Sequence, residues 1–265
     1  MDKPRPFGVW TRSLSSPGCW ILGILLLWAL GSACTGTDRK VLPPQVLFKK
    51  ARRAIQVENY EKAQEYLNQL MEDSPDSKER VLAQLLLADV YYKQELYEEA
   101  KFNYGKFLEL YPLHKLAPRA QYFKAMTEFR RIDIATRDQT FTHNAKAEFE
   151  KLVRVYPKSA YAAKAKEKIK RCISFLAENE LEIGRFYYRT SAYQSAISRF
   201  KGLLKEYPEQ SFRDEVLFLL GESYREEENY ENARQYFRQL LREHPRSEFT
   251  HEARARLREL PRARP

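Results

Sequence analysis

Apolar positions recur at a fixed spacing in five segments of the chain. Each segment has an alanine followed twelve residues later by a proline, as in Ala100 and Pro112. A large apolar residue comes four positions after the alanine and another comes three positions later, so both lie on one helix face. Because proline cannot continue a helix, each helix should end just before its proline. The five segments begin at Ala63, Ala100, Ala145, Ala196 and Ala233.

A second helix should precede four of these segments. Twelve residues before the alanine there is a small residue, and three residues beyond it there is usually a tyrosine, as in Gly221 and Tyr224. A small residue, an aromatic, an alanine and a proline in this order resemble the tetratricopeptide (TPR) helix–turn–helix pattern. We therefore expect an all-α, TPR-like right-handed solenoid of five repeats and about ten helices.

Two intervals between repeats are longer than the others. The distance from proline to the next alanine is 25 residues in two cases, but 33 between repeats 2 and 3 and 39 between repeats 3 and 4. The eight extra residues do not fit whole helical turns, so we expect Arg137–Asn144 to be a polar, non-helical loop. The fourteen extra residues are close to four turns of about 3.6 residues each, so they should extend one helix between repeats 3 and 4.

The N-terminus has the pattern of a secretory signal. Basic residues precede the apolar run Cys19–Leu30, which is too short to cross a bilayer comfortably because a span needs about 20 residues. Gly31–Cys34 resembles a lipobox, which predicts a lipoprotein signal peptide over 1–33, lipidation of Cys34 and a linker over 34–46. Gly31 stands where a lipobox usually has leucine. Cleavage by an ordinary signal peptidase, leaving a free Cys34, is therefore the alternative.

The charge pattern and the motif content of the sequence argue against an enzyme. The formal net charge is +10, but basic and acidic residues alternate along the predicted helices, which is typical of a solvated surface rather than of nucleic-acid binding. The four histidines are scattered and no catalytic or phosphate-binding motif is present. We therefore expect no enzyme, no cofactor and no metal site. Cys172 has the helical spacing of a buried small residue.

The irregular middle of the chain resembles the BamD family, the TPR lipoprotein of the outer-membrane β-barrel assembly machinery. The family has an Arg-Asp pair in a loop, a TPR unit ending in Tyr-Pro, a long helix, a tyrosine pair and a further alanine unit. Its glycine before that last unit is Ser191 here. The matching residues are Arg137-Asp138, Phe149 to Pro157, Ser159 and Tyr161, Leu176 to Glu180, Tyr187-Tyr188 and Ala192 to Ala196.

This resemblance implies a non-catalytic scaffold, anchored by lipid to the inner leaflet of a Gram-negative outer membrane and facing the periplasm. Its C-terminal half, 157–260, would bind the POTRA domains of a BamA-like barrel insertase, and other Bam lipoproteins would join the complex. Its N-terminal half, 47–156, would receive the C-terminal targeting segment of unfolded outer-membrane proteins. The alternative is another outer-membrane TPR lipoprotein of cell-envelope or cell-wall biogenesis. Residues 261–265 should form a disordered tail.

Aromatic and cationic side chains on the first helix of each repeat are the candidates for peptide binding. The alternative is that the aromatics only close the core between repeats and the cations are solvated. Arg137 and Asp138 either pair with each other, cap the next helix or serve the family function. We predict a substrate-peptide groove lined by Phe48, Arg52, Tyr92, Lys93, Arg119, Tyr122, Met126, Phe129 and Arg130. We predict insertase binding at Leu217, Tyr224 and Tyr230.

Overall fold

The computed structural model describes residues 41–134 and 138–261. All regular elements in these residues are α-helices. The predicted signal peptide, Cys34 and Arg137 lie outside the described residues, as does most of the predicted tail.

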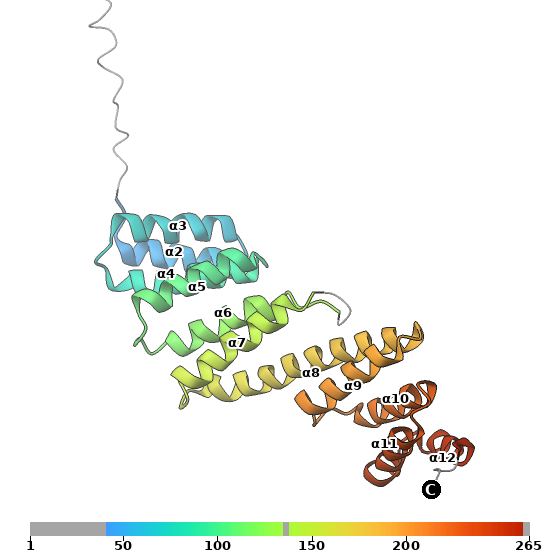
Figure 1. Ribbon diagram of the computed structural model, residues 1–265. Coiled ribbons are helices and arrows are strands. Elements are labelled where there is room, and N and C mark those ends of the chain that lie inside the picture. The colour runs from blue at the N-terminus through green and yellow to red at the C-terminus, as the bar shows by residue number, and fades with distance from the viewer. Residues whose placement is uncertain (1–40, 135–137, 262–265) are drawn as a thin grey trace, which may run out of the picture. The chain divides into compact units, whose positions relative to one another are not determined.

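The helices follow one another in pairs from α2 to α12 (Figure 1). Each of the five predicted repeats is present as two helices, joined by a short turn in all but repeat 3, and a single short helix follows the last pair, so the TPR-like fold is confirmed. The helices are α2 (Pro44–Gln56), α3 (Tyr60–Asp73), α4 (Lys78–Lys93), α5 (Tyr97–Leu110), α6 (Ala117–Phe129), α7 (Thr140–Val155), α8 (Ala160–Arg189), α9 (Tyr193–Glu206), α10 (Arg213–Glu226), α11 (Tyr230–Glu243) and α12 (Thr250–Glu259).

The repeated alanines bring the helices together. Each helix packs against the next one in the chain, and α2 also contacts α4, α6 contacts α8 and α8 contacts α10. Ala100, Ala196 and their equivalents are fully buried, as are the large residues four positions later, such as Phe200 and Phe237. Fully burying one such side chain contributes about 1.5–3 kcal/mol, so every repeat gains stability from the same position.

Four of the turns inside repeats contain a residue in the left-handed backbone region. These are Glu58, Glu95, Ser191 and Glu228, with φ of 57°, 61°, 59° and 55°. A side chain in this region costs about 1–2 kcal/mol because its Cβ crowds the following carbonyl, whereas glycine has no Cβ. Glycine at these turn positions should therefore stabilise the folded protein.

Ser191→Gly should raise the free energy of unfolding by about 1 kcal/mol, because it removes this steric cost. Ser198→Gly is the matched control: Ser198 is exposed within α9, where glycine should lower stability by a few tenths of a kcal/mol. Urea midpoints of the two variants measure the difference. A loss of stability for Ser191→Gly would contradict the assignment of strain to this turn.

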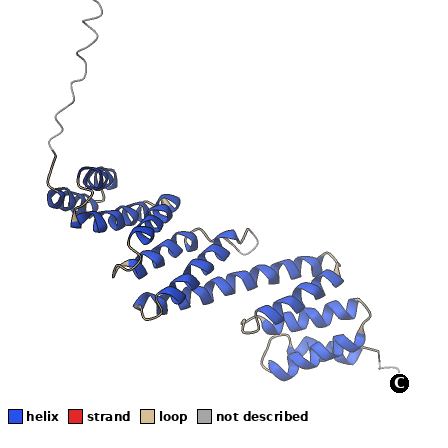
Figure 2. Ribbon diagram, turned by 60° about the vertical axis from the view of Figure 1, so that its left-hand side comes forward, coloured by secondary structure: helices blue, strands red, loops and turns tan. Residues whose placement is uncertain are grey.

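The predicted long helix is present as α8, which spans 30 residues (Figure 2). The Ser159 hydroxyl caps its start by accepting a 3.1 Å hydrogen bond from the Tyr161 backbone N–H. The first half of α8 contributes Ala165 and Cys172 to the core of repeat 3, and the second half contributes Leu181 to the core of repeat 4. Cys172 is fully buried, as predicted, and burial raises the pKa of its thiol to about 11.

The prediction that Arg137–Asn144 is non-helical is wrong for its second half, because α7 begins at Thr140. The Asp138 carboxylate accepts hydrogen bonds from the Thr140 backbone N–H at 3.1 Å and from its hydroxyl at 2.9 Å, which satisfies a donor at the helix start. The buried Thr142 hydroxyl donates to Gln139 Oε1 at 2.7 Å. Asp138 thus fits the capping alternative.

Candidate functional site

Two adjoining hollows lie on the surface formed by α2, α4 and α6. They enclose about 290 and 330 Å³ and share Leu86, Asp89 and Arg119 as walls. We call the joined hollows the groove. Its other walls are Phe48, Arg52, Leu82, Leu85 and Leu116 in the first hollow and Ile55, Val90, Tyr92, Lys93, Tyr104 and Phe123 in the second.

A carboxylate at the wall shared by the two hollows holds two neighbours in place. The Tyr104 hydroxyl donates to Asp89 Oδ1 at 2.6 Å, and Arg119 Nη2 lies 2.8 Å from Asp89 Oδ2. The Arg119 guanidinium also lies 4.9 Å from the centroid of the Phe123 ring. Burial lowers the pKa of Arg119, but Asp89 outweighs this and the net shift is upward. Arg119 is therefore a fixed part of the wall, already neutralised by Asp89.

Aromatic rings connect the groove to α8. Tyr92 on α4 lies 5.4 Å from Phe123 on α6, and Phe123 lies 5.6 Å from Tyr122. Tyr122 lies 5.4 Å from Tyr161 on α8. We call these four residues the aromatic row. Partial burial raises the pKa of the Tyr122 hydroxyl, consistent with a ring packed among others.

Phe129 and Arg130 lie at the end of α6, where it meets α8. The Phe129 ring is 6.4 Å from Phe175 and 4.4 Å from Lys168 Nζ, measured from its centroid. Arg130 Nε donates to the Tyr92 hydroxyl at 3.2 Å, which links this end of α6 to the groove. Sequence reasoning missed Lys168, because its lysine-rich surroundings read as a solvated surface.

The predicted site residues lie in the groove, beside it toward α8, in the core and among the C-terminal repeats. Phe48, Arg52, Tyr92, Lys93 and Arg119 line the groove, and Tyr122, Phe129 and Arg130 extend the surface toward α8. Met126 and Leu217 are only 7% and 0% exposed, so their side chains belong to the core and offer no surface. Tyr224 stacks on Tyr236 with ring centroids 5.5 Å apart, and Tyr230 is half-buried beside the same core.

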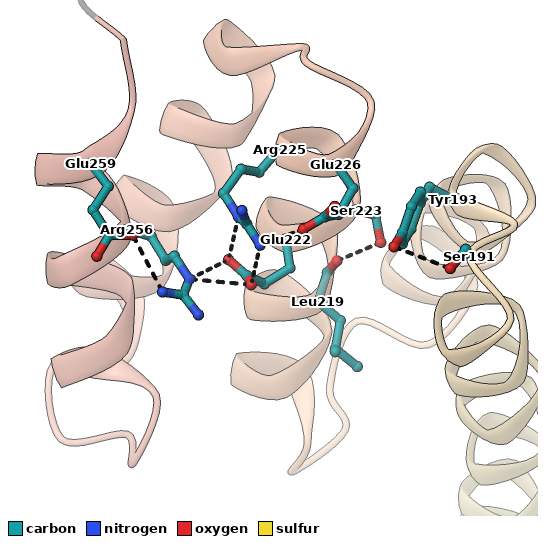
Figure 3. Close-up of polar contacts among 9 residues, drawn as sticks. All are labelled: Ser191, Tyr193, Leu219, Glu222, Ser223, Arg225, Glu226, Arg256 and Glu259. Carbon is teal, nitrogen blue, oxygen red and sulfur yellow. Dashed lines mark hydrogen bonds and ion pairs between the residues drawn. The ribbon is translucent and has the colours of Figure 1, made fainter.

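A buried carboxylate joins α10 to α12. Glu222 on α10 is 3% exposed and lies 3.1 Å from Arg225 Nη2 and 3.1 Å from Arg256 Nε (Figure 3). Arg256 comes from α12, so this contact fastens the final helix to repeat 5. The charge of Glu222 raises the pKa of Arg256. We call these three residues the Glu222 cluster.

Most of the chain is similar in sequence to known proteins. The family model YfiO, described as an outer membrane lipoprotein, matches residues 41–227, and a tetratricopeptide model matches residues 215–247. The outer membrane protein assembly factor BamD of Haemophilus influenzae is 30% identical over 213 residues, covering 76% of this chain and 81% of that protein. BamD of Caulobacter vibrioides is 29% identical over 207 residues, covering 76% and 68%.

Solved TPR structures also match. The TPR2AB domain of yeast Sti1 in complex with pHSP90 covers 82% of this chain and 83% of that chain at 12% identity, with a TM-score of 0.44. In the described part of this chain, none of the helices combines the length and the apolar character that a membrane span requires. The family model matches well over half of the sequence. The chain therefore belongs to the YfiO/BamD family of outer membrane lipoproteins.

Proposed function

We propose that this chain is a non-catalytic scaffold of outer membrane protein assembly. It is attached to the periplasmic face of the outer membrane through lipid on Cys34. Its N-terminal repeats bind the C-terminal targeting segment of unfolded barrel proteins, and its C-terminal repeats bind the POTRA region of a BamA-like insertase beside other Bam lipoproteins. Membership of the family and the outer membrane assembly role of the BamD relatives support this proposal.

The groove is the observation that carries the peptide-binding part of the proposal. Its walls are mostly aliphatic and aromatic, and the exposed cations Arg52 and Lys93 stand at its borders. An extended peptide with aromatic side chains would bury apolar surface there, while its backbone and charged end stay near polar groups. The groove is shallow and open along three helices, which suits a ligand that must be released again.

A photo-crosslinker tests the groove. Benzoylphenylalanine at position 93 should crosslink to unfolded outer-membrane barrel proteins during their assembly, because Lys93 lines the groove. The matched control places it at Phe102, which is 69% exposed on α5 and outside the groove. Equal crosslinking from both positions, or none from position 93, would remove the groove from the proposal.

Two further measurements address the partners and the anchor. Affinity isolation of the full chain from native membranes should recover a barrel protein with POTRA domains, and its absence would contradict the scaffold role.

The intact mass of the mature protein should correspond to a chain that starts at Cys34 and carries lipid. A mature protein with an unmodified Cys34 would favour the ordinary signal peptidase instead.

A further inference from the structure

Two cations lie over the Phe129 ring where α6 meets α8, and a third follows Phe129 in the chain. Lys168 Nζ lies 4.4 Å and Arg171 Cζ lies 5.6 Å from the ring centroid. Arg130 directly follows Phe129 and donates its Nε–H to the Tyr92 hydroxyl at 3.2 Å. We call Arg130, Lys168 and Arg171 the cation cluster.

The positive charge of the cation cluster is not balanced locally. Over the stretches that the structure describes, no Asp or Glu forms an ion pair with any of these three residues, whereas Arg119 in the groove is paired with Asp89. Partial burial lowers the pKa of Lys168, and the positive charges of Arg171 and Arg130 lower it further because each repels the charged ammonium. An anion bound among them would relieve this repulsion.

One acidic residue, Glu95, does act on the cation cluster through Arg130. The hydrogen bond to the Tyr92 hydroxyl raises the pKa of Arg130 most, and the charge of Glu95 raises it further from beyond ion-pair distance. Glu95 therefore offsets only part of the positive charge at Arg130. None of the causes that shift the pKa of Lys168 is an acidic residue.

The surroundings of the cation cluster indicate the kind of anion. Tyr92 lines the groove and also receives the hydrogen bond from Arg130, so the cluster adjoins one end of the groove. Two guanidinium groups and an ammonium suit a planar carboxylate, because a guanidinium presents paired N–H donors to its two oxygens. The Phe129 ring is half-buried under Lys168 and Arg171, so the part of it that stays exposed can contact the side chain beside that carboxylate.

We propose that the cation cluster binds the carboxylate of a polypeptide that lies in the groove. The polypeptide is thereby given a direction, with its carboxylate at α8 and the residues before it running toward α2. This inference rests on the proposed function, because it assumes that the groove holds a peptide. It adds Lys168 and Arg171, on a helix that does not line the groove, to the binding surface.

Fluorescence anisotropy of the purified full chain in detergent tests this inference with one extended, aromatic-containing peptide in three forms. The forms are the free C-terminal acid, the C-terminal amide and an amide that ends in glutamate. The free acid should bind about tenfold more tightly than the plain amide, because only the acid presents a charged pair of oxygens to the guanidinium and ammonium groups. Tight binding of the glutamate form would show that a side-chain carboxylate also serves.

Paired variants on α8 separate the cation cluster from general positive charge. Lys168→Gln with Arg171→Gln should bring the acid to the affinity of the amide and leave the amide unchanged. Lys166→Gln with Lys170→Gln removes the same charge from exposed positions of the same helix and should keep the tenfold preference. Circular dichroism and thermal midpoints establish that both variants are folded.

The possible outcomes distinguish this inference from the proposed function. Equal binding of acid and amide by the native chain overturns the carboxylate site but leaves peptide binding intact. An equal loss in both paired variants also overturns the site, because the attraction would then be nonspecific. If none of the peptides binds, the peptide-binding part of the proposed function fails together with the inference.

Discussion

Replacing Gly221 by alanine should lower the free energy of unfolding by about 2 kcal/mol. A Cβ at this position would lie 2.4 Å from Cε1 of Phe237, a ring that is fully buried in repeat 5. Overpacking a core typically costs about 1–3 kcal/mol, occasionally more, and the gain of about 1 kcal/mol in helix propensity offsets only part of a severe clash. Urea denaturation of the native protein and of the Gly221→Ala variant measures the difference in the free energy of unfolding.

Gly202→Ala is the matched control for this substitution. Gly202 also lies inside a helix, but a Cβ there would meet nothing within 4 Å. Alanine should therefore raise stability by about 1 kcal/mol through helix propensity alone. If Gly221→Ala is as stable as Gly202→Ala, the Phe237 ring can move aside and the close approach of α10 and α11 does not depend on the glycine.

Glu222→Gln should lower the free energy of unfolding by about 2 kcal/mol and loosen α12. Breaking a buried ion pair costs about 3–5 kcal/mol, but Arg225 and Arg256 are each 31% exposed, so water compensates part of the loss. Hydrogen exchange provides the local measurement. The amides of α12 should exchange faster in the variant, because Arg256 loses its partner on α10.

Glu231→Gln is the control for the Glu222 cluster. The Glu231 side chain is 81% exposed and lies 3.9 Å from Arg234, so its loss should change stability by less than about 0.5 kcal/mol. Unchanged exchange in α12 of the Glu222→Gln variant would mean that apolar packing alone holds this helix. In that case Ala253 and Leu260, which are buried with repeat 5, would account for its attachment.

The fold was predictable because each repeat carries its own stop signal and its own apolar stripe. The prediction is wrong at Thr140–Asn144 because it treats the polar character of this stretch as evidence against a helix. Thr142 is buried and bonded to Gln139, and Arg131 lies 3.9 Å from the centroid of the Phe141 ring. These contacts join residues of the loop to residues of α7. The spacing of apolar residues in the sequence does not predict them.

The candidate site was only half predictable. Positions in the first helix of repeats 1 to 3 predicted Phe48, Tyr92 and Lys93 as peptide-binding residues, and their side chains line the hollows between α2, α4 and α6. The same rule placed Met126 on the surface, whereas neighbouring helices cover it. Lys168 and Arg171 could not be singled out, since only the packing of α8 against Phe129 distinguishes them from other lysines and arginines of that helix.

The continuous helix α8 has a consequence for cooperativity. Neighbouring units of a repeat protein usually open separately, because each contacts only the next one. Here Cys172 and Leu181 belong to two different cores but to one uninterrupted helix, so neither core can lose its share of α8 without disturbing the other. Repeats 3 and 4 should therefore unfold as a single foldon, while repeat 1, at the N-terminal end of the array, frays independently.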